Sequence, residues 1–302
     1  MLRTSLLACS LFVFIAPSPA ADFDLYYLGG QSNMEGFGRV DELPDELSGE
    51  LSGVFIFQST PKKDQVAATG DGIWAVFRPG HGTGFRCEQG MNRYSDRFGL
   101  EVSLAHALKK KHPDRNIAII KYARNGSSIA SQAAANWGCW EPDFNATDGE
   151  HRDINQYDHF LATVRHAFAD TDLDDDGEPD RLVPKGIAWM QGESDATNEA
   201  TSQQYEANLK RLVDLFRAAL RVDDLPVVIG RISDSGNAPE GTVWKHGEAV
   251  RAAQQTVAEH DVNAVLVTST DEYDYSDPWH YDSTGYVDLG RKFAEAFDQF
   301  SK

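Results

Sequence analysis

Two polar segments far apart in the chain carry residues whose types and spacing could do chemistry. Residues 29–36 read Gly-Gly-Gln-Ser-Asn-Met-Glu-Gly, and a tight glycine-rich turn of this kind can present the hydroxyl of Ser32. Residues 276–280 read Ser-Asp-Pro-Trp-His, which puts Asp277 and His280 three residues apart on one loop. A histidine oriented by a carboxylate can take the proton of a serine. These three residues could therefore form a nucleophilic triad in the chain order Ser…Asp…His.

Two further segments offer groups that could stabilise a developing oxyanion. Residues 189–195 contain the amide donor of Gln191 and the carboxylate of Glu193, and residues 125–128 offer the backbone N–H of Gly126. Taken alone, each of these four segments also fits a structural role, as a helix cap, a turn or an ordinary strand-to-loop transition. The chemical interpretation therefore depends on whether the fold brings the segments together.

All four segments follow short apolar runs that are typical of strands buried on both faces. The expected strands are Phe23–Leu28, Val54–Phe57, Ile117–Ala123, Gly186–Met190, Val227–Arg231 and Ala264–Thr268. Between them, apolar residues at helical spacing predict helices at Glu101–Lys111, Gln156–Ala169, Gln203–Leu220, Val243–His260 and Thr284–Gln299. Strands that alternate with helices predict a three-layer α/β/α sandwich around a mainly parallel, flavodoxin-like sheet. Ligands bind such a sheet at the carboxyl ends of its strands, where these segments would lie.

The order of the motifs resembles a known superfamily. Gly-Gln-Ser-Asn-Met near the start, Gln-Gly-Glu-Ser midway and Asp-x-x-His near the end are similar to the SGNH hydrolases, and more narrowly to carbohydrate esterases built on the sialate O-acetylesterase domain, which include acetylxylan esterases. Phe98-Gly99-Leu100-Glu101 is similar to a Phe-Gly-Pro-Glu element of that group, with Leu100 in place of proline. The resemblance covers essentially the whole chain after residue 20.

The resemblance implies a role for each site residue. Ser32 would be the nucleophile, His280 the general base and Asp277 its partner, while the N–H groups of Ser32 and Gly126 and the side chain of Gln191 would form the oxyanion hole. Glu193 either replaces Asp277 as the support of His280 or braces its own loop. The implied reaction moves an acetyl group from a carbohydrate hydroxyl, in xylan or on sialic acid for example, to Ser32 and then to water. It needs no cofactor.

Two other function classes remain open. One is a catalytically idle carbohydrate-binding module of the same fold, although such a module has no need of all three triad residues. The other is a lipase or thioesterase of the wider superfamily, whose acyl pocket should be deep and apolar. The long irregular stretches 58–98 and 131–153 are instead polar and aromatic, with Trp137 and Trp140 available either to stack on a sugar or to pack the loop around Cys139.

An acidic loop provides a separate signal for a metal. Asp172, Asp174, Asp176 and Asp180 occupy positions 1, 3, 5 and 9 of an EF-hand-type calcium loop, with glycine at position 6. Position 12 is Val183 rather than the usual bidentate carboxylate. The spacing predicts a structural calcium ion, the alternative being a solvated acidic loop.

The first twenty residues predict export. A positive start, an apolar run and a small-residue end at Ala20 are typical of a secretory signal peptide, which leaves residues 21–302 as one secreted or periplasmic domain. A competing interpretation makes residues 6–9 a lipoprotein box with Cys9 as the anchor, but the apolar run continues past Cys9. An oxidising compartment favours a disulfide between the remaining cysteines, Cys87 and Cys139.

The charge balance excludes several partners. Lys plus Arg number 28 against 47 Asp plus Glu, a net charge of −19, and no basic cluster interrupts this surface. Such a chain repels nucleic acid phosphates and anionic lipids. No stretch of the chain is long and apolar enough to predict a membrane span. The sequence leaves the oligomeric state undetermined.

Overall fold

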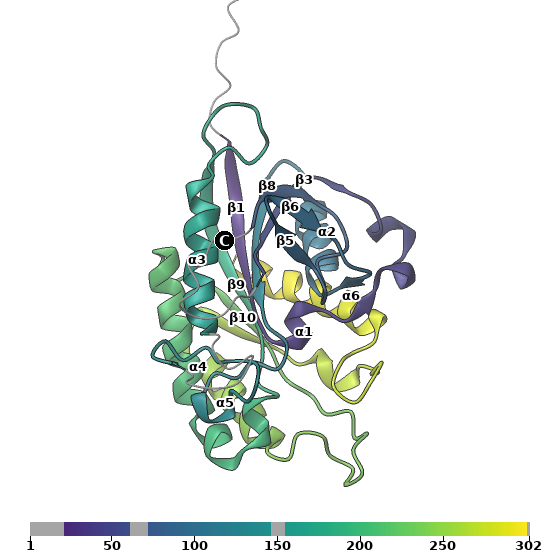
Figure 1. Ribbon diagram of the computed structural model, residues 1–302, viewed down its shortest axis with the longest axis vertical. Helices are drawn as coiled ribbons and strands as arrows, with labels where there is room; N and C mark the ends of the chain where they lie inside the picture. Colours follow the sequence, from purple (N-terminus) through teal and green to yellow (C-terminus); the bar gives the residue numbers. More distant parts are fainter. Residues whose placement is uncertain (1–20, 61–71, 146–154, 301–302) are drawn as a thin grey trace, which may run out of the picture.

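The computed structural model describes residues 21–60, 72–145 and 155–300. The predicted signal peptide and Cys9 lie outside this part, as do segments of both long loops. A seven-stranded sheet forms the centre of the described chain, in the order β11-β10-β9-β1-β8-β3-β4 (Figure 1). Every pairing is parallel except that of β4 with β3.

All six predicted strands are confirmed, and the predicted fold class with them. They are β1 (Asp22–Gly30), β3 (Leu51–Gln58), β8 (Asn116–Ala123), β9 (Arg181–Met190), β10 (Val227–Gly230) and β11 (Ala264–Val267). β1 lies between β8 and β9, and its residues from Phe23 to Gly30 are all buried. The segment that carries Ser32 therefore leaves the middle of the sheet.

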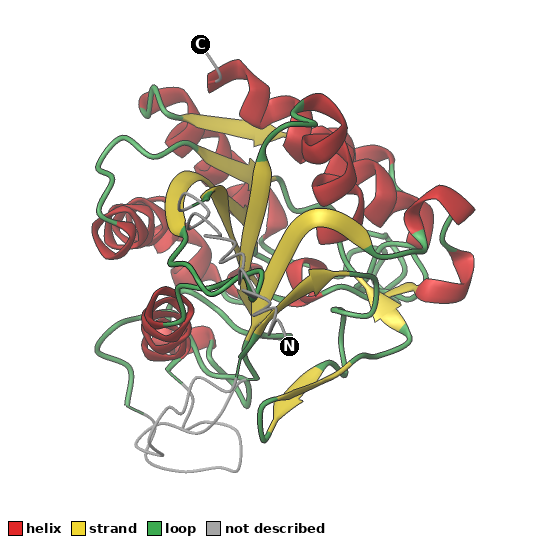
Figure 2. Cartoon of the chain, turned by 90° about the horizontal axis from the view of Figure 1, so that it is seen from above, coloured by secondary structure: helices red, strands yellow, loops and turns green. Residues whose placement is uncertain are grey.

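Helices cover both faces of the sheet (Figures 1 and 2). One layer holds α2 (Glu101–Lys111) and α6 (Ser283–Phe297), and the other holds α3 (Gln156–Ala169), α4 (Glu199–Leu220) and α5 (Gly247–His260). α1 (Ser32–Glu35) is a single turn directly after β1. The arrangement is the predicted three-layer sandwich.

Two helix starts differ from the prediction by four residues because of local hydrogen bonds. α4 begins four residues earlier than expected, since the side chain of Asn198 accepts the N–H groups of Ala200 and Thr201 as an N-cap. α5 begins four residues later, because the N–H groups of Val243 and Trp244 donate to the carboxylate of Asp234 in the preceding loop.

The stretch 58–98 contains more regular structure than the predicted long loop. It holds β4 (Trp74–Phe77) at the edge of the sheet, a ribbon of β5 (Arg86–Glu88) with β6 (Met91–Arg93), and β7 (Arg97–Phe98), which pairs with β2 (Gly38–Arg39). These strands are two to four residues long, too short to produce a visible alternation in the sequence.

Candidate active site

Ser32 lies at the carboxyl end of β1, where the chain turns sharply into α1. Gly30 makes the turn with a φ of 149°, and a Cβ there would collide with the carbonyl oxygen of Met190 on β9. Gln31 follows as the N-cap and Ser32 as the first helical residue, 4% exposed. The sharp turn at Gly30 and the central position of β1 therefore place Ser32 at the edge of the sheet where ligands bind.

Asp277 and His280 form a hydrogen-bonded pair on the loop before α6. His280 Nδ1 lies 2.7 Å from Asp277 Oδ2, while the N–H groups of Trp279 and His280 donate to Asp277 Oδ1 at 2.8 and 2.9 Å. Burial acts to raise the pKa of Asp277, but these hydrogen bonds outweigh it and lower the pKa. The His280 ring is also stacked on Phe37, with ring centroids 3.6 Å apart. The imidazole is therefore held in one orientation.

Asn33 ties the serine turn to the histidine loop. Its Nδ2 donates to the carbonyl oxygen of Trp279 at 3.2 Å, and its Oδ1 accepts the hydroxyl of Tyr286 on α6 at 2.7 Å. Within the described residues no hydrogen bond joins Ser32 Oγ to His280, so the two segments are connected here through the side chain of Asn33. Catalytic hydrogen bonds often shorten only when substrate binds.

Glu193 supports Asn33 rather than His280. Its Oε1 accepts Asn33 Nδ2 at 2.7 Å, and the carboxyl is 1% exposed. Burial raises the pKa of Glu193 to about 7, although the hydrogen bond from Asn33 acts to lower it. Of the two roles that the sequence leaves open, the geometry matches the bracing role, and Asp277 is the carboxylate beside His280.

The two backbone N–H groups predicted for the oxyanion hole are both available. Those of Ser32 and Gly126 have no acceptor within the described part of the chain. Gly126 has a φ of 71°, and the indole of Trp137 packs directly against it. The Arg124 guanidinium carbon in turn lies 5.1 Å from the Trp137 ring centroid. Trp140, by contrast, is fully buried and belongs to the core.

The predicted role of Gln191 does not fit its surroundings. The side chain is 0% exposed, and Nε2 already donates to Asp195 Oδ2 at 2.7 Å and to Ser127 O and Gln31 Oε1 at 3.2 Å each. An amide nitrogen has only two protons, and here three acceptors surround them. Gln191 thus holds the loops after β8 and β9 together and presents no donor to a substrate.

A buried ion pair beneath α1 was not predicted. Lys121, on β8, donates from Nζ to Glu101 Oε2 at 2.8 Å and to the carbonyl oxygens of Glu35 and His81 at 2.9 and 2.8 Å. Both charged side chains are 0% exposed. The Phe-Gly-Leu-Glu motif contained Glu101, but nothing in the apolar run of β8 indicated that Lys121 would be its partner.

Comparison with known proteins places the chain in a family. Residues 22–299 match the family described as carbohydrate esterase, sialic acid-specific acetylesterase. The chain belongs to this family. No curated protein matches it.

Solved structures share the fold of this family member at low identity. An Arabidopsis thaliana protein superposes with a TM-score of 0.61 and 20% identity, over 93% of this chain and 99% of that one. NanS gives 0.59 and 18%, over 94% and 98%. A carbohydrate acetylesterase from Xanthomonas citri gives 0.60 and 17%; the match covers 92% of this chain but only 57% of that longer one.

The acidic loop of this family member brings three of the four predicted ligands together. Carboxylate oxygens of Asp172, Asp174 and Asp176 lie within 4.8 Å of one another. Asp180 is not in this group, and its Oδ2 accepts the N–H of Leu173 at 2.8 Å. Three converging carboxylates suit a hard cation such as calcium. The described geometry therefore fits a cation site with three of the four predicted carboxylate ligands.

The predicted disulfide is not present in the described structure. Cys87 and Cys139 are both buried, and no bond joins them to each other. The backbone of Cys87 is held in β5 by Thr60 Oγ1, whereas that of Cys139 pairs with Ser128 and Asn155. The two segments are therefore anchored to different partners.

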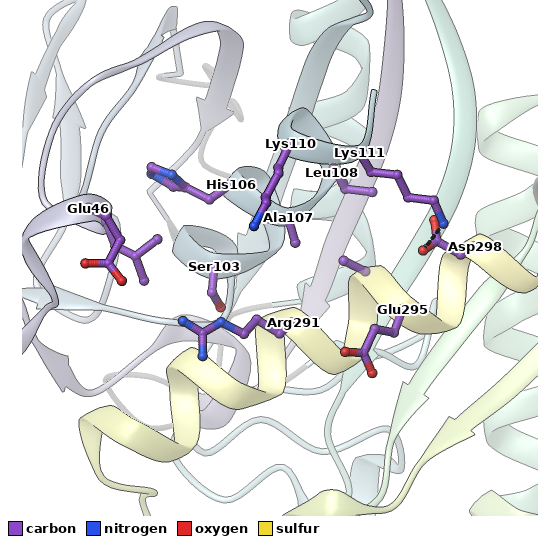
Figure 3. A pocket seen from close by; sticks show the side chains of 12 residues that line it. Glu46, Ser103, His106, Ala107, Leu108, Lys110, Lys111, Arg291, Glu295 and Asp298 are labelled. Atoms are coloured by element: carbon purple, nitrogen blue, oxygen red, sulfur yellow. Dashed lines mark ion pairs between the residues drawn. The ribbon is translucent and has the colours of Figure 1, made fainter. Parts of the chain in front are cut away.

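A groove between α2 and α6 has a volume of about 730 Å³ and is separate from the site (Figure 3). Ser103, His106, Lys110 and Arg291 line it, together with the ion pair of Lys111 and Asp298. None of Ser32, Asp277 and His280 belongs to its wall. In addition, no helix within the described residues is long and apolar enough to cross a membrane.

Proposed function

We propose that this protein is an exported serine esterase that removes O-acetyl groups from a carbohydrate through an acetyl-Ser32 intermediate. The observation that carries the proposal is the Asp277–His280 pair, held by three hydrogen bonds at the sheet edge where Ser32 follows β1. Membership of the esterase family supports it independently. Export rests on the sequence of residues 1–20.

The chemistry follows from the geometry of this pair. Asp277 holds the Nδ1 proton of His280, which leaves Nε2 to take the proton of Ser32 as Oγ attacks the acetyl carbonyl. The N–H groups of Ser32 and Gly126 would stabilise the oxyanion. His280 then returns the proton to the departing sugar oxygen, and water repeats the sequence on the acyl-enzyme. No step requires a cofactor.

The surroundings favour a sugar over a lipid. Trp279, next to His280, is 51% exposed, and Trp137 lies partly exposed beside Gly126. Aromatic faces of this kind stack on pyranose rings, whereas a lipase needs an enclosed apolar pocket. We further propose that Asp172, Asp174 and Asp176 hold a structural calcium ion that takes no part in the reaction.

The decisive experiment measures acetate release from acetylated xylan and from O-acetylated sialosides, with Ser32→Ala as the matched variant. We expect release from one substrate class and nearly complete loss in the variant, which should fold normally because Ser32 Oγ bonds no described residue. A Ser32→Ala protein that retained most of the activity would refute the nucleophile. A well-folded wild type that bound a glycan without releasing acetate would instead favour the binding-module alternative.

A further inference from the structure

Arg124 lies beside the turn of the nucleophile and has no role in the proposed reaction. It directly follows β8, and its backbone N–H donates to the carbonyl oxygen of Gly30 on β1 at 3.1 Å. Its own carbonyl oxygen accepts the hydroxyl of Ser127 at 2.7 Å. Ser32 comes two residues after Gly30, and Gly126 comes two residues after Arg124. The backbone of Arg124 is therefore fixed between the nucleophile and a predicted donor of the oxyanion hole.

The guanidinium of Arg124 is held by an aromatic ring. Its central carbon lies 5.1 Å from the centroid of the Trp137 ring, which is the distance of a cation–π contact. The same indole packs against Gly126, so the positive charge lies one ring away from the oxyanion hole. A cation–π contact attracts the charge but gives its N–H groups no oxygen to bind.

No acidic side chain of the described residues neutralises this charge. Arg124 makes no ion pair and no side-chain hydrogen bond with them, although the chain carries 47 acidic residues against 28 basic ones. Its Nε is fully enclosed without a partner, whereas Nη1 and Nη2 are not among the enclosed atoms and so retain accessible surface. The residue as a whole is partly buried. The open end of the guanidinium therefore has two nitrogens available to a ligand.

The chemistry of this group indicates which ligand it suits. A guanidinium presents parallel N–H groups that match the two oxygens of a carboxylate. When the acetyl carbonyl accepts the N–H groups of Ser32 and Gly126, the sugar is one oxygen away from the acetyl carbon and lies beside the same turn. The long-range field of a chain with a net charge of −19 repels an acidic sugar, and a local cation offsets this repulsion at short range.

We propose that Arg124 binds a carboxylate on the sugar that carries the acetyl group, so that acetylated acidic sugars are preferred over neutral xylose units. This assignment rests on the proposed acetylesterase function and names the substrate class of the same site. The contact is remote from the bonds that change and is equally strong in the bound substrate and in the transition state. Arg124 therefore acts through KM rather than through kcat. Uronic acids and sialic acids both carry the required carboxylate.

The first test compares acidic substrates with their neutral amides on wild-type protein. The pairs are an O-acetylated glucuronoside with its carboxamide and an O-acetylated sialoside with its carboxamide, so each pair differs in one charge. We expect kcat/KM for acetate release to be about 10–100-fold higher for the acid of at least one pair, the value of a charge-assisted hydrogen bond. The pair that shows this preference identifies the sugar. Equal values for acid and amide in both pairs overturn the assignment.

The second test is Arg124→Gln, which removes the charge and keeps a polar side chain. We expect KM for the preferred acid to rise by about 10–100-fold with kcat within a few-fold of wild type, while the rate on its amide stays unchanged and shows that the variant is folded. Arg124→Lys keeps a charge and should keep part of the preference. Arg165→Gln, on an exposed position of α3, removes the same charge elsewhere and is the matched control. A preference for the acid that survives in Arg124→Gln overturns the assignment.

These measurements distinguish the carboxylate site from the esterase activity on which it rests. Acetate that is released equally from acids and amides, and is not released by Ser32→Ala, contradicts the carboxylate site and leaves the esterase proposal intact. Folded wild-type protein that releases acetate from none of these substrates contradicts the esterase proposal and the assignment together.

Discussion

Trp279 shows how a single residue can serve two purposes at this site. Its backbone is fixed, since its N–H donates to Asp277 Oδ1 and its carbonyl oxygen accepts from Asn33 Nδ2. Its indole nevertheless remains 51% exposed, 6.4 Å from the His280 ring between centroids. The backbone orders the histidine loop, while the side chain is available to a ligand.

We expect Trp279→Ala to lower kcat/KM for the acetylated saccharide by roughly 2- to 10-fold, the value of one aromatic stacking contact of about 0.5–1.5 kcal/mol. The rate on a small aryl acetate should change less, because that substrate has no sugar ring to stack. Trp279→Phe is the matched control and should retain most of the saccharide activity. Equal losses on both substrates would mean that the indole acts only on the shape of the loop.

Residue types and spacing identified most of this site but not its internal partners. Ser32, Asp277, His280 and Gly126 were predicted, because each lies in a segment that follows a strand of the sheet and those strands are parallel. The sequence assigned Gln191 to the oxyanion hole and could not show that its amide nitrogen donates to Gln31, Ser127 and Asp195 instead. That depends on hydrogen bonds between loops about 160 residues apart.

At the scale of elements, the turn that carries Ser32 is supported from below by Lys121 and Glu101. Lys121 Nζ donates to the carbonyl oxygen of Glu35, the last residue of α1, and Glu101 Oε1 accepts the N–H of Gly99. The pair thus joins β8, α1 and the start of α2.

We expect Lys121→Met to destabilise the fold by about 3–5 kcal/mol, because it leaves the Glu101 carboxylate buried without its counter-charge. Chemical denaturation followed by fluorescence measures this. The double variant Lys121→Met, Glu101→Leu should recover part of the loss, since no isolated charge remains. A single variant as stable as wild type would show that the pair contributes no support to α1.

The acidic loop before β9 is the element whose stability should depend on metal. Calcium that binds Asp172, Asp174 and Asp176 only in the folded state would stabilise the protein by about 2.7 kcal/mol at a concentration one hundred times its dissociation constant. Added calcium should therefore raise the melting temperature, chelator should lower it, and Asp174→Asn should reduce the response. Asp45→Asn, an exposed acid elsewhere, is the control. A melting temperature that changes with neither calcium nor chelator would refute the proposed calcium site.

Long periodic elements were predictable, whereas their ends and the short strands were not. α2 and α3 begin and end where expected, because their apolar faces and flanking loops are both visible in the sequence. α5 begins late because Asp234, in the preceding loop, accepts the N–H groups of its expected first turn. β4 was missed because its four residues pair antiparallel at the edge and leave Val76 exposed.

For the whole molecule, the buried carboxyl of Glu193 couples stability to pH. Burial raises the pKa of Glu193 from 4.5, the ordinary value of a glutamate side chain, to about 7 in the folded protein. The hydrogen bond from Asn33 opposes this rise. Between these two values the folded state binds a proton that the unfolded state has lost. The contribution of Glu193 to the free energy of unfolding is therefore greatest below about pH 4.5, and it declines as pH rises through 7. Burial also raises the pKa of Asp195, to about 6, which acts in the same direction.

Glu193→Gln isolates this contribution, because the amide keeps an oxygen to accept Asn33 Nδ2 but cannot titrate. In wild type one such proton gives a slope of at most about 1.4 kcal/mol per pH unit. We expect the free energy of unfolding, measured by denaturant titration from pH 5 to pH 8, to fall less steeply in Glu193→Gln than in wild type. The variant should consequently gain stability over wild type as pH rises through 7. Parallel curves for the two proteins would show that the carboxyl is already ionised at pH 5, and that Asn33 and its link to the histidine loop are held by a charge.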